Sequence, residues 1–165
     1  MSKINNTPKN TDNEVVNRMR GAFGHRATWM GLMYDEARKR GIDLEEAGRA
    51  AISKTGHIHG ERINKNKPVD TVEAFRDTFL DELGQKMFEM EFTKCDDEEL
   101  NVEFHYCPLV TAWQDLGFDD ETIETLCDMA MDGDRGIAAE NGFEFTLGDT
   151  IAKGCKTCSL KFKKK

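Results

Sequence analysis

The sequence predicts an α+β fold, in which a helical N-terminal half packs on a small antiparallel sheet with inserted helices. Apolar residues recur at three- and four-residue steps through the first half of the chain. In several later segments they recur at two-residue steps instead. The first spacing is that of an amphipathic helix, and the second is that of a strand with one buried face. Helices packed on antiparallel strands place the chain in the α+β class.

The N-terminal half contains the helical segments. Residues 1–13 are polar with little to bury, so we expect a disordered lead-in before a single domain over residues 14–165. Basic residues, glycines and capping side chains then set the expected ends of each element. The expected elements are a helix from Glu14 to Arg40, a helix from Leu44 to Lys54 ending near Gly56, an Asn- and Lys-rich loop through Pro68, and a helix from Val72 to Leu83.

The C-terminal half contains the strands and two shorter helices. Alternation at Phe88, Met90 and Phe92 precedes a polar turn, which indicates an antiparallel hairpin. Pro at an early helical position and acidic residues in a first turn mark the two helices that follow. The remaining expected elements are a strand from Leu100 to Cys107, a helix from Leu109 to Leu116, a helix beginning near Asp119 with an apolar stripe through Met131, a strand from Phe143 to Leu147, and a strand from Cys158 to Phe162.

Charge and hydropathy limit the classes of partner. The 165 residues carry a net charge of −8, whereas nucleic-acid binding requires clustered Lys and Arg. No apolar run approaches the ~20 residues that span a bilayer, and the polar N-terminus lacks a signal-peptide core. We therefore expect a cytoplasmic protein that binds a small-molecule substrate and neither nucleic acid nor membrane. The sequence leaves the oligomeric state open.

Residues 104–108 place an imidazole and a thiol two residues apart at the end of a predicted strand. Successive strand side chains point to opposite faces, so His105 and Cys107 share one face while Phe104 and Tyr106 share the other. A strand with one solvated face has the same pattern, and a cysteine is often a small core residue. These residues alone leave a functional site and a structural role open.

The five cysteines suggest thiol chemistry, metal binding or core packing rather than a disulfide framework. Cys155 and Cys158 form a CxxC pair, a spacing found in zinc, iron–sulfur and dithiol sites. A metal site needs further ligands, and the chain offers only the widely spaced Cys107 and Cys127. The alternative metal set is therefore Cys107, Cys127, Cys155 and Cys158.

The C-terminal half resembles the L-2-amino-thiazoline-4-carboxylic acid hydrolase family, and the match lies mainly there. The shared pattern is a Cys at a strand end, a second Cys and an Asp on a helix, a Thr-Leu and Gly step, and a terminal Cys-containing strand. Its members in this chain are Cys107-Pro108-Leu109, Trp113, Gly117, Cys127, Asp132, Phe145, Thr146-Leu147, Gly154 and Cys158-Ser159-Leu160-Lys161-Phe162. The chain departs from this pattern in having one additional cysteine, Cys155.

The resemblance implies a hydrolase that acts on a non-peptide carbon–nitrogen or carbon–sulfur bond of a cyclic amidine. It would open a thiazoline ring towards N-carbamoyl-cysteine without a cofactor. In this scheme Cys107 attacks the C2 carbon, His105 acts as its base or as an acid, and Asp132 orients water or holds the amidine cation. A thiolate at Cys107 implies a depressed pKa, and a protonated His105 would supply it.

The other residues of the expected site line the substrate pocket. Trp113, Cys127 and Cys158 are the candidate substrate-binding residues, and the two cysteines could instead ligate a metal that activates water. The competing hypothesis is a non-catalytic metal- or small-molecule-binding module with a Cys-rich site for zinc or an iron–sulfur cluster.

Overall fold

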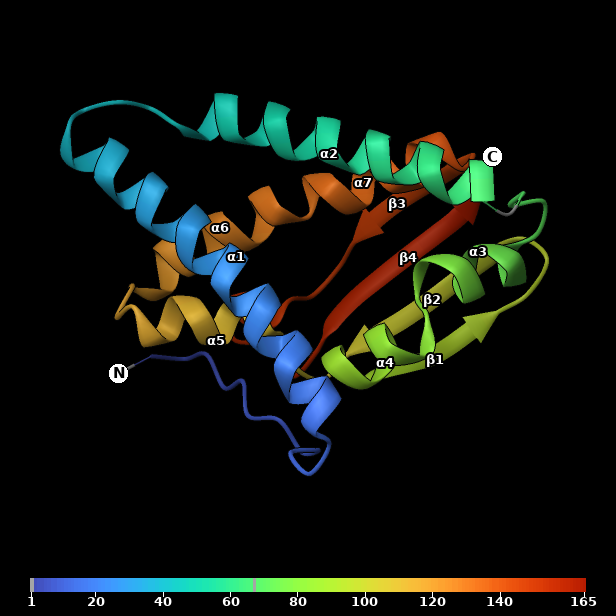
Figure 1. Cartoon of the computed structure of the whole chain (residues 1–165), viewed down its shortest axis with the longest axis horizontal. Coiled ribbons are helices and arrows are strands. Elements are labelled where there is room, and N and C mark those ends of the chain that lie inside the picture. The colour runs from blue at the N-terminus through green and yellow to red at the C-terminus, as the bar shows by residue number, and fades with distance from the viewer. Residues whose placement is uncertain (1, 67) are drawn as a thin grey trace.

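The computed structural model describes residues 2–66 and 68–165, which form the predicted α+β fold (Figure 1). Met1 and Lys67, which fall in the expected lead-in and the expected loop, lie outside the described residues. The elements in chain order are α1 (Glu14–Lys39), α2 (Glu45–Asn66), α3 (Val72–Phe79), α4 (Glu82–Phe88), β1 (Met90–Cys95), β2 (Glu99–Phe104), α5 (Pro108–Asp115), α6 (Asp120–Ala130), α7 (Asp132–Glu140), β3 (Phe143–Leu147), the short 3₁₀ helix η1 (Ile151–Lys153) and β4 (Cys158–Lys164).

The sheet has the strand order β1-β2-β4-β3, and every neighbouring pair is antiparallel. This confirms the predicted hairpin and both C-terminal strands. On the two central strands, every second side chain is buried: Leu100 pairs with Phe162, and Phe104 pairs with Cys158. Paired residues share a face, so the helices cover one face of the sheet and Cys158 belongs to that covered face.

Helices α2 and α7 pack with their backbones in close contact, and this packing corrects one prediction. The second helix does not end near Gly56 but continues to Asn66. Gly56 and Gly60 are buried in it, because a Cβ on Gly56 would collide with the Gly133 carbonyl and one on Gly60 would lie 2.7 Å from Glu140 Cβ. Glycine here permits a close helix approach that outweighs its weak helix propensity.

Capping side chains and one short break divide two other expected helices. The helix expected from Val72 to Leu83 ends at Phe79, and the Asp81 side chain accepts a hydrogen bond from the Gly84 amide to begin α4. Beyond the apolar stripe of α6, a new helix, α7, follows the break at Met131. Among the helices that the structure describes, none has the length and apolar character needed to cross a membrane.

The N-terminal segment, expected to be disordered, instead lies against the domain in an extended form. Ile4 is buried, and the Lys3 amide donates to Asp120 Oδ2 over 2.8 Å. Figure 1 shows the segment running beside α5 before it turns into α1. Its order depends on long-range partners such as Asp120, which a polar composition does not reveal.

We expect Gly136→Ala to destabilise the protein by about 1–3 kcal/mol, the usual cost of overpacking. A Cβ at this position would lie 2.7 Å from the Ser53 carbonyl oxygen and 2.9 Å from the His57 amide nitrogen, so the α2 backbone would have to move. Urea unfolding followed by circular dichroism measures the change.

Gly21→Ala is the matched control, because Gly21 is also helical but its added methyl group meets no atom within 4 Å. We expect this control to gain about 0.5–1 kcal/mol from helix propensity. An unchanged urea midpoint for Gly136→Ala would contradict the close approach of α2 and α7.

Candidate active site

Cys107 lies at the point where the chain leaves the hairpin and enters α5. Its backbone is extended (φ −135°, ψ 113°), and Pro108 begins the helix, a position that suits proline. Burial raises the pKa of the Cys107 thiol, while the amides of Val110 and Leu109 in the first helical turn favour the ionised sulfur. The half-buried thiol is therefore neutral at pH 7, beside groups that would stabilise a thiolate.

Two further thiols lie within electrostatic range of Cys107. Cys127 on α6 and Cys158 at the start of β4 are both buried, and Cys158 Sγ accepts a hydrogen bond from the Ile151 amide over 3.2 Å. Burial raises the pKa of Cys127 and raises that of Cys158 to about 12. A negative charge on Cys107 would raise both values further, so the three sulfurs lie close enough to interact electrostatically.

The carboxyl of Asp134, on α7, completes this cluster. Burial raises its pKa to about 7, and the positive charge of Arg26 on α1 opposes that rise. The carboxyl charge in turn raises the pKa of Cys107 and Cys127. Asp134 is half-buried, so solvent still reaches it. A carboxyl that titrates near neutral pH beside a thiol is typical of an acid–base pair.

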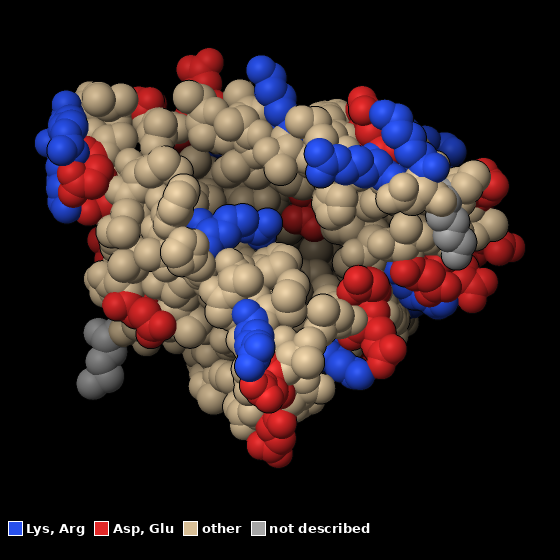
Figure 2. Space-filling view, in the orientation of Figure 1, with Lys and Arg blue, Asp and Glu red and all other residues tan. Residues whose placement is uncertain are grey.

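The molecular surface is hollowed between α1 and α2. Figure 2 shows this hollow at the centre of the face, with a basic side chain lying across it and acidic side chains at its bottom. Arg26 is exposed, and its guanidinium lies 4.6 Å from the centre of the Phe23 ring. The positive charge of Arg26 also acts on the Asp134 carboxyl.

Asp132, the predicted catalytic carboxylate, is engaged in ion pairs. Its Oδ2 lies 3.1 Å from Arg49 Nη1, and its Oδ1 lies 2.6 Å from Arg135 Nη1. Asp128 accepts from the same two arginines at 2.8 Å each. Both oxygens of Asp132 are thus held by charged donors, and Asp134 is the better candidate to exchange protons.

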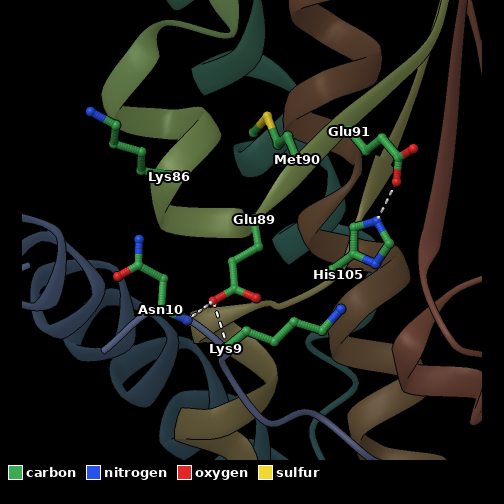
Figure 3. Close-up of a pocket in the computed structure, with 7 residues that line it drawn as sticks. All are labelled: Lys9, Asn10, Lys86, Glu89, Met90, Glu91 and His105. Carbon is green, nitrogen blue, oxygen red and sulfur yellow. Dashed lines mark hydrogen bonds and ion pairs between the residues drawn. The ribbon is translucent and has the colours of Figure 1, made fainter. Parts of the chain in front are cut away.

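His105, the predicted base of Cys107, pairs elsewhere. Its Nε2 lies 3.0 Å from Glu91 Oε2, and the ring lines a pocket of about 370 Å³ whose lining does not include Cys107 (Figure 3). The predicted depression of the Cys107 pKa is wrong, because desolvation raises that pKa above the ordinary value for a thiol. The groups that do act on this thiol are the charges of Asp134 and Arg26 and the helix amides.

Trp113, expected to contact substrate, lies in the core. Its side chain has no exposed surface, its indole N–H donates to the Ala27 carbonyl over 2.9 Å, and a Cβ on Gly31 would lie 3.0 Å from its Cδ1. The tryptophan therefore joins α5 to α1 rather than lining a cavity.

The alternative metal set is not assembled in the described part of the chain. Cys155 is half-buried in the turn before β4, and no three or more His, Cys, Asp or Glu side chains among the described residues are arranged to hold an ion. His57 and His59 lie on α2 rather than on the expected loop, and His57 Nδ1 pairs with Glu140 Oε1 at 2.6 Å.

Comparison with known proteins identifies the family. The family model described as L-2-amino-thiazoline-4-carboxylic acid hydrolase matches residues 21–162. The chain belongs to this family. The predicted family is therefore correct. The restriction of the match to the C-terminal half is wrong, because the match includes most of α1 and all of α2. No curated protein and no solved structure matches the chain.

Two groups in this thiazoline-carboxylate hydrolase family member were missed from the sequence. Asp134 lies two residues after Asp132 in the same acidic stretch, which was the only local signal for it. Arg26 belongs to a helix far away in the sequence, and only the tertiary fold brings its charge to Asp134. Neither group belongs to a motif of fixed spacing.

We expect Asp134 to make stability fall as pH rises from about 4 to about 7. Below its ordinary pKa of 3.8 the carboxyl is protonated in both states; above that value the unfolded chain ionises first, until the folded pKa of about 7 is reached. The slope is at most about 1.4 kcal/mol per pH unit. Asp134→Asn removes this loss. The free energy of unfolding of the variant should therefore rise relative to that of wild type as the pH increases from about 4 to about 7.

Urea unfolding at four pH values between 4.5 and 7.5 tests this linkage. Asp12→Asn is the control, because Asp12 is exposed in the N-terminal segment. Parallel pH profiles for wild type and Asp134→Asn would show that the carboxyl ionises as freely in the fold as outside it.

Proposed function

We propose that this protein hydrolyses the ring of 2-amino-thiazoline-4-carboxylate, or of a closely similar cyclic amidine, to the N-carbamoyl amino acid. One observation carries the proposal: the Asp134 carboxyl, with a pKa near 7, acts on the Cys107 thiol at a helix start. Membership of a family named for this reaction supports the choice of substrate class.

The reaction adds one water to the ring and loses no atom. A nucleophile attacks C2, which carries the ring sulfur and two nitrogens, and the bond from C2 to the ring sulfur breaks. The ring sulfur leaves as the thiol of cysteine and takes one proton. The C2 carbon keeps both nitrogens and gains the water oxygen, which gives N-carbamoyl-cysteine.

In the proposed first step, Cys107 attacks C2 while its proton passes to Asp134. The raised pKa of Cys107 keeps the resting thiol neutral, so it requires a base, and an ionised Asp134 is present at neutral pH. The protonated carboxyl then gives the proton to the departing ring sulfur. The amides at the start of α5 stabilise negative charge on Cys107 as the proton leaves.

The second step releases the enzyme. Asp134, ionised again, takes a proton from water as the water oxygen adds to the amidinium carbon bound to Cys107. Collapse of this adduct expels the Cys107 sulfur, which recovers its proton, and leaves the carbamoyl group on the product. One carboxyl therefore serves both steps, which requires a pKa close to the working pH.

Arg26 is the proposed partner of the substrate carboxylate. Its guanidinium is exposed, and its charge acts on both Asp134 and Cys107. A planar guanidinium binds a carboxylate through two parallel hydrogen bonds. Cys127 and Cys158, both neutral by burial, form the wall behind the reacting thiol.

We expect Cys107→Ser to lower turnover by on the order of 10³-fold, because a hydroxyl is a far weaker nucleophile than a thiol at this site. Release of the ring sulfur from 2-amino-thiazoline-4-carboxylate is followed with a thiol reagent, and mass spectrometry identifies the product. Cys95→Ser, at an exposed thiol on the far end of β1, should retain full activity. Undiminished turnover by Cys107→Ser would remove the nucleophile role, and absence of turnover in wild type would favour a binding module.

We expect Arg26→Gln to raise KM about tenfold or more, because a hydrogen-bonded ion pair with the substrate carboxylate contributes about 1.5–3 kcal/mol. The effect should disappear with 2-amino-thiazoline, which has no carboxylate. Arg18→Gln is the control, since Arg18 is exposed on α1 and pairs with Glu14 one turn away. An equal loss with both substrates would show that Arg26 does not bind the carboxylate.

A further inference from the structure

The N-terminal segment contacts Cys107 through one side chain, that of Asn6. Asn6 Oδ1 accepts a hydrogen bond from the Cys107 backbone N–H over 2.9 Å, and Asn6 Nδ2 donates to the Cys107 carbonyl over 2.8 Å. The same Nδ2 donates to Thr111 Oγ1 over 2.9 Å. A single side-chain amide thus pairs with both polar groups of the Cys107 backbone, as a neighbouring strand would.

Cys107 has little other support for its extended conformation. Strand β2 ends at Phe104, so its ladder stops before Cys107. The remaining hydrogen bond of this backbone runs from the Thr111 amide to the Cys107 carbonyl and is long, at 3.3 Å. A residue that precedes a helix keeps its orientation only while its backbone groups are satisfied, and Asn6 supplies both partners.

Asn6 is itself fixed from both sides along the segment. Before it, the Lys3 amide donates to Asp120 Oδ2 at the start of α6, the helix that carries Cys127. After it, the Lys9 and Asn10 amides both donate to Glu89 Oε1 over 2.8 Å. These hydrogen bonds fix the segment on both sides of Asn6, so its side-chain amide meets Cys107 in one defined position.

We propose that Asn6 is a positioning residue for the Cys107 thiol, which it aligns through the backbone. The inference rests on the proposed function for its catalytic meaning. Asn6 lies before residue 21, where the family match begins, so the alignment comes from this chain's own N-terminal segment. A displacement of about 1 Å at a reacting atom costs on the order of 10²-fold in rate, whereas substrate binding elsewhere in the hollow is little affected.

The test is Asn6→Ala, with Asn5→Ala as the matched control. Asn5 is an exposed asparagine of the same segment, and its side-chain oxygen accepts a hydrogen bond from Thr7 Oγ1. For Asn6→Ala we expect kcat to fall at least tenfold with KM changed less than threefold. In the absence of substrate, iodoacetamide should alkylate Cys107 several-fold faster, because a loosened backbone exposes a half-buried thiol. Asn5→Ala should match wild type in both measurements.

The buried thiols of Cys127 and Cys158 report the state of the fold in the same experiment. They should stay protected in Asn6→Ala, and a common rise in reactivity of all three thiols would overturn the inference by showing a purely stabilising role. An unchanged Cys107 rate, or faster alkylation with undiminished kcat, would also overturn it. If wild type turns over no cyclic amidine but the Cys107-selective rise is seen, the alignment stands and the proposed reaction falls.

Discussion

The close approach of α2 and α7 is the constraint on which the rest of the structure depends. Gly133 and Gly136 lie on the α7 side of this contact, and Asp134 lies between them in the sequence. With Gly56 opposite, the two backbones come into contact, which fixes the position of α7 against α2. Backbone contact leaves α7 no room to shift or rotate, so main-chain geometry fixes the position of the half-buried Asp134 carboxyl.

Burial dominates the electrostatics of the cluster. The charge of Cys107 raises the pKa of Cys127 and Cys158. The charge of Asp134 raises the pKa of Cys107 and Cys127, so this region disfavours a second negative charge. The positive charges of Arg26 and Arg135 favour the ionised form of Asp134.

Local patterns were enough to predict most of the secondary structure. The long first helix, the hairpin, the helix after Pro108 and the last two strands all follow from periodicity and turn residues. The errors arose where distant contacts override local preference: Gly56 reads as a helix end but is a packing contact, and the N-terminal segment reads as disordered but is anchored by side chains far away in the sequence.

The sequence selected candidate site cysteines, whose role stays a prediction, but it did not supply their partners. Cys107, Cys127 and Cys158 were selected from the sequence, and the fold brings them together. Strand alternation suggested His105 beside Cys107, yet the strand ends at Phe104 and the alternation does not extend to the thiol. Pairing between the ends of different elements depends on tertiary structure, which sequence spacing cannot supply.

The different environments of the Asp132 and Asp134 side chains follow from helical geometry. At about 100° per residue, side chains two positions apart point in nearly opposite directions. Asp132 therefore meets Arg49 and Arg135, and although burial alone would lower the pKa of Arg49, its hydrogen bonds to acidic side chains raise it. Those arginines pair directly with Asp132, whereas the desolvation of Asp134 is opposed only in part by the charges of Arg26 and Arg135. One turn of α7 thus supplies a fixed ion pair that anchors the helix and a carboxyl free to exchange a proton near pH 7.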